Sequence, residues 1–260
     1  MDAPLGSASP SAPLFSLRGI SHVFPNGNKA LSDITLDIHE EECLFITGSN
    51  GSGKTLLIRI ACGLVEPSCG DVFFHGIPLD RARDVRSSVG MVFQDADSQI
   101  VGETVAEDIA FGPKNLRLPK DEIAERVHSA LSAMGLTEKR DYPPRRLSGG
   151  EKRRLAVAGI LAMGCSAIIM DEPFANLDYH GVVQVLDIIK HMKTEEKTII
   201  ILTHELEKAL AYADRLVILD KGRIRDQGRA DETLDRLVPS YGVRDPRKTY
   251  TCAADCTWLD

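Results

Sequence analysis

The chain has no long hydrophobic run. Its longest uncharged stretch runs from Leu155 to Met170 and is interrupted by two glycines, a cysteine and a serine. A membrane-spanning helix needs roughly 20 apolar residues, more than this stretch contains. The N-terminal segment MDAPLGSASPSAP has neither the basic patch nor the apolar centre of a secretory signal. We therefore expect a cytoplasmic protein that does not cross a membrane by itself.

Basic residues are in the minority. The 31 Lys and Arg residues stand against 38 Asp and Glu residues, which gives a net charge of −7. No extended basic field is present to attract a polyanion. We therefore expect no nucleic-acid partner.

Cysteines are few and scattered. The six cysteines do not form the dense framework of a small secreted domain, and a reducing compartment keeps such residues as thiols. Cys252 and Cys256 form a single C-x3-C pair, but no second pair or nearby histidine cluster completes four zinc ligands. We predict no metal site there.

The composition is that of a packed globular protein. The 260 residues are 43% hydrophobic and 27% charged, and the length suits one large α/β domain or two small ones. Near-continuous apolar segments are typical of parallel strands covered on both faces, and the helices between them favour right-handed βαβ units. We predict an α/β fold with a mainly parallel core sheet, an antiparallel β layer from the chain up to Glu40, and a helical subdomain. The predicted strands are Phe15–Ile20, Ile34–Ile38, Cys43–Thr47, Asp71–His75, Val89–Phe93, Ala167–Met170, Thr198–Leu202 and Leu216–Leu219.

The residue pattern of two segments predicts helices. Lys54 to Ala61 is helical in character and ends before Gly63, which suits the position after a helix C-cap. Between Asp121 and Met134, apolar residues recur at the spacing of one helix face, and Gly135 follows. The second helix predicts the helical subdomain.

A glycine-rich phosphate-binding motif follows the predicted strand Cys43–Thr47. The pattern G-x-x-x-x-G-K-[ST] lies between a strand and a helix, where backbone N–H groups and the helix dipole converge on a polyphosphate. Lys54 then meets the β- and γ-phosphates, and the Thr55 hydroxyl binds Mg²⁺. The motif comprises Gly48, Ser49, Asn50, Gly51, Ser52, Gly53, Lys54 and Thr55.

Polar residues end the neighbouring strands at the same predicted sheet edge. Asp171 and Glu172 end one apolar run, His204 ends the next, and Gln94 ends the strand Val89–Phe93. Asp171 suits an Mg²⁺ site through water, and Glu172 suits the general base that activates water. His204 suits a contact with the γ-phosphate or with the base. The Gln94 amide suits Mg²⁺ or the attacking water.

A second glycine turn opens a later helix that begins near Glu151. Ser148 suits an ordinary helix N-cap. The turn Ser148, Gly149 and Gly150 also has the features of a second anion-binding helix N-terminus. One phosphate group hardly needs two such cradles from one chain, so the second suits the nucleotide of a neighbouring molecule.

Taken in order, these motifs resemble those of the ATP-binding cassette (ABC) ATPases. GSNGSGKT, Gln94, LSGGE, AIIMDEP, the Asn176-Leu177-Asp178 turn and His204 look like the Walker A, Q-loop, signature, Walker B, D-loop and H-switch. The resemblance spans about residues 14–230 and implies the P-loop NTPase fold of ABC ATPases, with ATP and Mg²⁺ as cofactors.

The resemblance also implies a dimer of two cassettes, closed head to tail. Each ATP then lies between the Walker A motif of one copy and the signature of the other, within reach of Asp178, and Phe24 occupies the place of the adenine-stacking aromatic residue. A homodimer and a heterodimer are both compatible with these motifs, because one chain contains both half-sites. Glu151 departs from the commoner glutamine and adds a negative charge to the signature. The implied boundaries are a disordered tail at 1–13, the ATPase domain at 14–238 with its helical subdomain at about 95–163, and a C-terminal extension at 239–260.

The segments Val92–Gln99 and Thr104–Pro113 resemble the energy-coupling-factor (ECF) branch of the family, and Gln99 matches an additional glutamine of that branch. The resemblance implies an importer of a micronutrient such as cobalt or nickel ions, biotin or another vitamin. Its partners are then a transmembrane coupling subunit and a substrate-binding membrane subunit. A helix of the coupling subunit is expected in the groove between Gln94 and residues 104–134, which places the chain at the cytoplasmic face of the membrane.

Two other functions stay open at this point. A soluble ABC ATPase acting on nucleic acid or ribosomes usually carries tandem cassettes, long insertions or basic extensions, whereas this chain has one cassette and a net charge of −7. A regulatory scaffold that binds ATP without turnover is opposed by the presence of Glu172 and His204. Both alternatives leave an ATP site in the same place.

Overall fold

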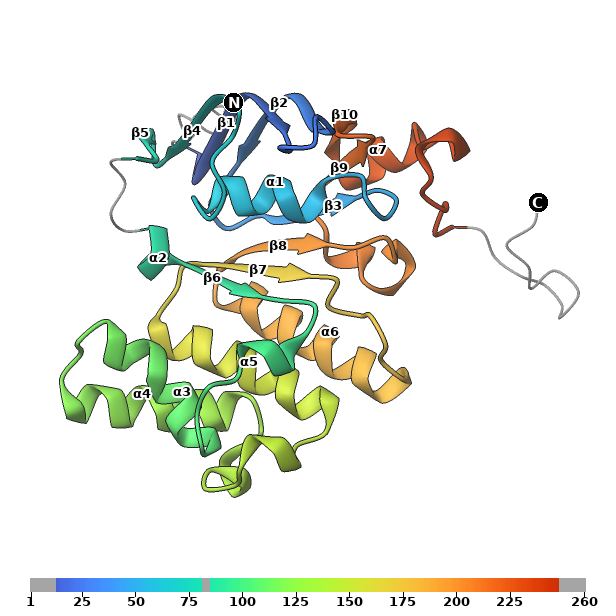
Figure 1. Cartoon of the computed structure of the whole chain (residues 1–260). Helices are drawn as coiled ribbons and strands as arrows, with labels where there is room; N and C mark the ends of the chain where they lie inside the picture. Colours follow the sequence, from blue (N-terminus) through green and yellow to red (C-terminus); the bar gives the residue numbers. More distant parts are fainter. Residues whose placement is uncertain (1–12, 81–84, 248–260) are drawn as a thin grey trace, which may run out of the picture.

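The computed structural model describes residues 13–80 and 85–247, which form two β-sheets and a group of helices arranged in layers (Figure 1). The antiparallel sheet lies at the top of Figure 1, the central sheet crosses the middle, and helices α3 to α6 lie below it. Except for Pro13, the predicted N-terminal tail lies outside the described residues, as do Cys252 and Cys256.

The central sheet is mainly parallel, as predicted. Its strand order is β10-β9-β3-β8-β7-β6, and only the edge pair of β10 with β9 is antiparallel. The sequence analysis did not predict β10, because its sequence RIRDQGR alternates between exposed and half-buried positions and contains one large apolar residue. The strands are β3 (Cys43–Thr47), β6 (Val89–Val92), β7 (Ala167–Asp171), β8 (Thr198–Leu202), β9 (Arg215–Asp220) and β10 (Arg223–Arg229).

The antiparallel layer extends beyond the segment that ends at Glu40. Its strand order is β2-β1-β4-β5, so the chain returns to this sheet after helix α1. The expectation that the chain up to Glu40 forms the layer was therefore incomplete, because β1 pairs with β4 along its second edge. The strands are β1 (Phe15–Val23), β2 (Lys29–Ile38), β4 (Cys69–Phe74) and β5 (Ile77–Pro78).

Alternate residues of the central strands face two separate cores. Leu44 and Ile46 of β3 belong to the core that contains α1 and the antiparallel sheet. Cys43 and Phe45 of the same strand belong to the core that contains the helices on the other face. Because successive side chains of a strand point to opposite faces, a strand covered on both sides is apolar at every position. This arrangement explains the continuous apolar runs in the sequence.

The helices confirm the predicted subdomain and shift one boundary. The helix predicted over Asp121–Met134 is α4, and α3 and α5 pack against it. Helix α5 begins at Gly149 instead of near Glu151, because Ser148 is its N-cap. The helices are α1 (Lys54–Ala61), α2 (Val85–Ser88), α3 (Val105–Asn115), α4 (Lys120–Ala133), α5 (Gly149–Met163), α6 (Tyr179–Thr194) and α7 (Ala230–Asp235).

The C-terminal part of the described chain packs onto the domain. After α7, a 3-10 turn covers Pro239–Tyr241, and Val243 is buried in the core that contains helices α3 to α6. Arg247 forms ion pairs with Asp235 and Asp245. Among the described residues, no helix has both the length and the apolar character needed to cross a membrane.

Candidate functional site

The glycine-rich loop connects β3 to α1, as predicted, and its glycines have backbone conformations that other residues rarely adopt. Gly48 has φ of 151° and Gly53 has φ of 106°. A Cβ atom at Gly48 would lie 1.9 Å from the carbonyl oxygen of Leu219, the end of a neighbouring strand. Position 48 therefore requires glycine, because any other side chain would collide with Leu219.

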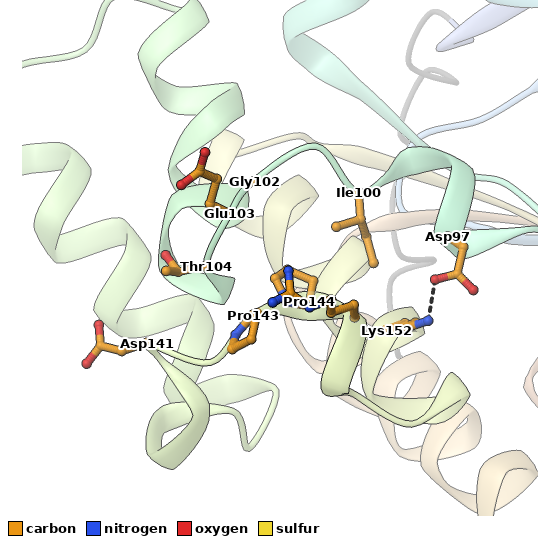
Figure 2. Close-up of a pocket in the computed structure, with 10 residues that line it drawn as sticks. Asp97, Ile100, Gly102, Glu103, Thr104, Asp141, Pro143, Pro144 and Lys152 are labelled. Atoms are coloured by element: carbon orange, nitrogen blue, oxygen red, sulfur yellow. Dashed lines mark ion pairs between the residues drawn. The ribbon is translucent and has the colours of Figure 1, made fainter.

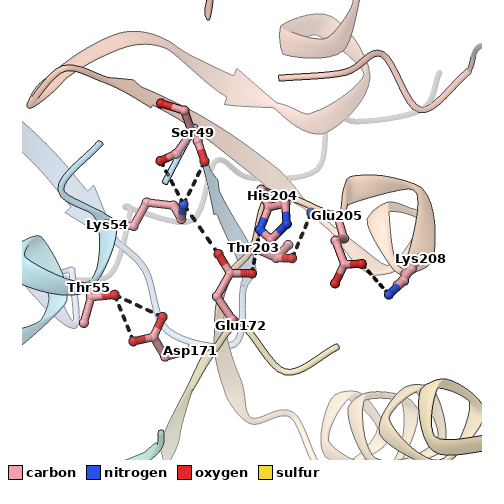
Figure 3. Close-up of polar contacts among 10 residues, drawn as sticks. Ser49, Lys54, Thr55, Asp171, Glu172, Thr203, His204, Glu205 and Lys208 are labelled. Atoms are coloured by element: carbon pink, nitrogen blue, oxygen red, sulfur yellow. Dashed lines mark hydrogen bonds and ion pairs between the residues drawn. The ribbon is translucent and has the colours of Figure 1, made fainter. Parts of the chain in front are cut away.

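Lys54 lies buried at the centre of the loop. Its Nζ donates to the carbonyl oxygens of Gly48, at 2.7 Å, and Ser49, at 3.4 Å, and lies 3.5 Å from a carboxylate oxygen of Glu172 (Figure 3). The hydroxyl of Ser52 is also buried, and it has no hydrogen-bond partner among the described residues. A buried cation beside an unpartnered hydroxyl in a glycine loop suits a phosphate group.

Thr55 and Asp171 meet at the mouth of this loop. The Thr55 hydroxyl lies 2.9 Å and 3.1 Å from the two carboxylate oxygens of Asp171, which ends β7. Burial raises the pKa of Asp171, although the hydrogen bond from Thr55 acts in the opposite direction. A hydroxyl and a carboxylate side by side are oxygen ligands of the kind that Mg²⁺ prefers.

Glu172 lies between Lys54 and His204. One carboxylate oxygen of Glu172 faces Lys54, and the other lies 3.1 Å from Nδ1 of His204 (Figure 3). The backbone of Glu172 has φ of 47°, a left-handed conformation that costs free energy for a residue other than glycine. The side chain is 10% exposed, so a largely enclosed carboxylate has both a cation and an imidazole as neighbours.

One pocket of about 310 Å³ gathers most of the predicted site residues. Phe24 and Ala30 line one part of it, and the carboxylates of Asp171 and Glu172 line another. His204 joins the pocket through its contact with Glu172. The predicted site residues that line the pocket are Phe24, Asn50, Gly51, Ser52, Gly53, Lys54, Thr55, Gln94, Asp171 and Glu172.

Gly48 and Ser49 of the loop do not line this pocket, and neither do four predicted site residues at the starts of α5 and α6. Ser148, Gly149 and Gly150 form the start of α5, where the Ser148 hydroxyl accepts from the N–H of Glu151 at 3.3 Å. Asp178 is the N-cap of α6 and accepts from the N–H of Gly181 at 2.8 Å. These residues have helix-capping roles within one chain, and a role toward nucleotide needs a second molecule.

The sequence analysis missed Arg153, which connects the elements of the site. Its buried guanidinium donates to the carbonyl oxygen of Pro173, which follows Glu172, and lies 3.4 Å from the carbonyl oxygen of Gln94. Burial lowers the pKa of Arg153. No sequence signal marks it, because Arg153 stands between two other basic residues, Lys152 and Arg154.

Gln99 fixes the turn after β6. Its side-chain amide donates to the carbonyl oxygen of Met91 at 2.7 Å and accepts from the N–H of Phe93 at 3.2 Å. The sequence analysis singled out Gln99 because it matches an additional glutamine of the ECF branch. In the structure, Gln99 holds the backbone next to Gln94. It is a support for the loop and does not line the pocket.

A groove of about 770 Å³ lies between this turn and the start of α3 (Figure 2). Asp97 and Ile100 line one side, Glu103 and Thr104 line another, and the ion pair of Lys152 with Asp97, at 2.5 Å, closes one end. Of the residues expected to border the helix of a membrane partner, Gln94 and residues 104–134, only Thr104 lines this groove.

The chain is similar in sequence to ATP-binding proteins of transporters. The family model described as ABC transporter matches residues 31–175. The energy-coupling factor transporter ATP-binding protein EcfA2 of Methanospirillum hungatei is 41% identical over 85% of this chain, and the chain spans 56% of that relative's length. The cobalt import ATP-binding protein CbiO of Rhodobacter capsulatus is 39% identical, over 88% of this chain and 84% of that protein.

A solved structure has the same fold. CbiO1 of Clostridium perfringens, described as part of the ABC transporter complex CbiONQ, superposes with a TM-score of 0.80 at 35% sequence identity. The match covers 86% of this chain and 91% of that structure. Fold and sequence similarity therefore agree over most of the chain.

Proposed function

The chain belongs to the ABC transporter family, and on that premise we propose that it is the ATP-binding and ATP-hydrolysing subunit of an ECF-type importer. The observation that carries the proposal is the convergence of Lys54, Glu172 and Gln94 on one pocket. Lys54 begins the helix after β3, while Glu172 and Gln94 follow β7 and β6, so segments far apart in the sequence supply the groups expected to act on the phosphates of a nucleotide.

In this proposal, different residues of the pocket bind the phosphates, accept the proton of water and contact the adenine ring. Lys54 leaves its carbonyl partners and binds the β- and γ-phosphates, while the loop N–H groups surround them. Glu172 accepts a proton from the attacking water, and His204 holds the second oxygen of Glu172 and reaches the γ-phosphate. Phe24 offers an exposed aromatic face for the adenine ring.

Thr55, Asp171 and Gln94 are the residues that would hold Mg²⁺. The hydrogen bond between Thr55 and Asp171 already places two oxygen ligands together, and Gln94 adds an amide oxygen to the same pocket. When bound, Mg²⁺ neutralises charge on the β- and γ-phosphates. With Mg²⁺ bound, the Thr55 hydroxyl and the Asp171 carboxylate would hold the ion instead of the hydrogen bond between them.

The second half of the site comes from another cassette. Ser148, Gly149, Gly150 and Asp178 lie outside the pocket of their own chain, and the N-terminus of α5 is suited to an anion. We infer that they contact the nucleotide held by a second ABC subunit, either a copy of this chain or a related one. ATP binding then favours the closed dimer, because only that state uses both half-sites.

The importer reading rests on the relatives and on the groove between the turn after β6 and the start of α3. The named relatives serve energy-coupling-factor and cobalt transporters, so the proposed cargo is a micronutrient such as cobalt or nickel ions, biotin or another vitamin. The groove of Figure 2 is proposed to receive a helix of a transmembrane coupling subunit, next to a substrate-binding membrane subunit. The chain is then bound peripherally at the cytoplasmic face of the membrane.

The substitution Glu172→Gln tests the proposed catalytic role. It keeps the shape of the side chain but removes the base, so we expect hydrolysis to fall by about a hundredfold or more while ATP binding and an ATP-bound dimer persist. Release of phosphate and gel filtration with ATP and Mg²⁺ measure the two effects. Glu125→Gln, at an exposed position of α4, is the matched control and is expected to hydrolyse ATP normally.

Two results would contradict the proposal. Unchanged hydrolysis in Glu172→Gln removes Glu172 from the role of base. Purification of the tagged chain from its native membranes tests the transporter assignment, because recovery of ribosomes without any integral membrane protein supports a soluble ABC ATPase instead. Recovery of integral membrane proteins in stoichiometric amounts supports the importer.

A further inference from the structure

The signature turn of this chain contains a carboxylate that requires compensation. Glu151 directly follows Gly150 at the N-terminus of α5. On the proposed function, this turn approaches the γ-phosphate of ATP held by the second subunit. A negative charge at that position repels the phosphate and opposes closure of the dimer.

Lys139 supplies the opposite charge. Its Nζ forms a hydrogen-bonded ion pair with Oε1 of Glu151, and the side chains are 35% and 16% exposed. Oε2 of Glu151 accepts from the backbone N–H of Ser148 at 2.9 Å, which completes a capping box. The contact with Lys139 lowers the pKa of Glu151, which favours the ionised carboxylate.

The backbone around Lys139 is held in place for this contact. Lys139 ends the 3-10 turn Thr137–Lys139; its N–H donates to Leu136 at 2.9 Å, and its carbonyl oxygen accepts from Tyr142 at 3.0 Å. The other cation near Glu151, Arg154, lies at 3.9 Å and is too far away for a hydrogen bond. Lys139 is therefore the main cationic partner of Glu151 among the described residues.

We propose that Lys139 is a positioning residue of the signature, which neutralises Glu151 and holds the turn Ser148, Gly149 and Gly150 in the conformation that meets ATP on the second subunit. The proposal rests on the proposed function. Lys139 acts through Glu151 and does not itself touch the nucleotide. With a neutral glutamine in place of Glu151, the capping box persists and the lysine is no longer needed.

A double-mutant cycle in the Glu172→Gln background tests this role. The variants are Lys139→Met, Glu151→Gln and the two combined, and the readout is the ATP concentration that gives half-maximal dimer formation. We expect Lys139→Met to raise that concentration roughly fivefold, because an unpaired carboxylate then faces the phosphate. The combined variant is expected to return to within about twofold of the parent.

Lys193→Met is the matched control. Lys193 is 32% exposed and pairs with Asp214 at 3.1 Å, so the substitution removes an equivalent surface ion pair outside the signature turn. Thermal unfolding without nucleotide is measured for every variant. A purely structural role for Lys139 lowers the melting temperature and leaves the combined variant as impaired as Lys139→Met.

The outcomes separate the inference from the proposed function. If the parent forms an ATP-dependent dimer and Lys139→Met matches the parent and the Lys193→Met control, the inference is wrong and the proposed function stands. The same holds if the combined variant is not rescued. If the parent forms no ATP-dependent dimer and the wild-type chain hydrolyses no ATP, either alone or with a second ABC subunit, the proposed function itself fails, and the inference fails with it.

Discussion

Asp171 and Glu172 are adjacent carboxylates with different surroundings. Asp171 is bonded to the hydroxyl of Thr55, and burial raises its pKa. Glu172 lies between a cation and an imidazole, Lys54 and His204. Different environments suit neighbouring acids to different chemical roles, and the proposed roles are a ligand for a cation in Asp171 and a base in Glu172.

Replacing Thr55 with valine tests the first of these roles. Thr55→Val keeps the volume of the side chain but leaves Asp171 without its hydrogen-bond donor. We expect the Mg²⁺ concentration for half-maximal hydrolysis to rise by about tenfold, and the free energy of unfolding to fall by about 1 kcal/mol. Titration of Mg²⁺ and urea unfolding measure these changes. Thr194→Val, which removes an exposed hydroxyl at the end of α6, is the control, and an equal effect in both variants would contradict the prediction.

The cysteines provide a prediction with a defined pH dependence. Burial raises the pKa of Cys62 to about 12, against roughly 8.5 for an ordinary thiol, whereas Cys69 is exposed. The thiolate is the reactive form, so at pH 8 a raised pKa makes Cys62 roughly a few thousandfold less reactive. We expect iodoacetamide to modify Cys69 first, and the rate at Cys62 to rise about tenfold per pH unit below its pKa. Peptide mass mapping measures this order, and equal labelling at pH 8 would overturn it.

Residues of the site could be predicted where the order of strands, loops and helices along the chain determines their position. The order of strand, glycine loop and helix placed Lys54 and Thr55, and the ends of buried strands placed Asp171 and Glu172. Arg153 was not predictable, because its partners are backbone carbonyl oxygens whose positions depend on tertiary packing. The contact of Glu151 with Lys139 was not predicted for the same reason, since Lys139 approaches it from a separate turn.

At the level of elements, the hairpin of β9 and β10 supports the phosphate loop. Gly222 at its tip donates to the carbonyl oxygen of Ser52 at 3.0 Å and accepts from the N–H of Ser32 at 2.8 Å. It therefore links the central sheet, the phosphate loop and β2. A Cβ atom at Gly222 would lie 2.3 Å from the carbonyl oxygen of Ala30, and its φ is 71°.

Gly222→Ala is expected to weaken the loop and the fold together. Displacement of the backbone should lower the free energy of unfolding by about 2 kcal/mol or more and reduce ATP affinity severalfold. Gly76→Ala is the matched control, since Gly76 has φ of 74° but open space around its Cβ position. It should lose about 1 kcal/mol of stability and keep its ATP affinity. Unfolding by urea and nucleotide binding measure the difference, and equal losses would refute the bracing role of the hairpin.

Continuous apolar patterns predicted the elements best. The bounds predicted for β3, α1 and β8 agree with the structure, because an apolar core covers these segments and glycine or polar residues flank them. The edge strand β10 and helix α7 were not predicted. Their residues are largely polar, and tertiary contacts determine their structure, because β10 pairs with β9 and α7 packs against both strands.

At the scale of the whole molecule, both half-sites lie on one chain but in different places. The pocket around Lys54 lies at the sheet edge, whereas Ser148 lies at the start of α5 and outside that pocket. The proposed closed two-fold dimer of this chain would contain two composite sites, each with Lys54 and Glu172 from one copy and Ser148 from the other. Two inactive variants can therefore complement each other.

Mixing Glu172→Gln with Ser148→Arg tests this arrangement. Each variant alone disables both composite sites of its own dimer. A mixed dimer has one site with both defects and one intact site, so an equal mixture should regain up to about a quarter of the wild-type hydrolysis rate, because half of randomly formed dimers are mixed. Phosphate release before and after mixing, at constant total protein, measures the recovery.

The same experiment distinguishes a homodimer from a partnership with a different cassette. Recovery on mixing requires that copies of this chain exchange and share sites. If each variant stays inactive after mixing while the wild-type chain hydrolyses ATP alone, composite sites between copies are excluded. If the wild-type chain gains activity only with a second ABC subunit, the signature of that subunit completes the site around Lys54. Ser148→Arg in this chain should then impair the nucleotide site that contains the partner's Walker A motif and leave the site around Lys54 intact.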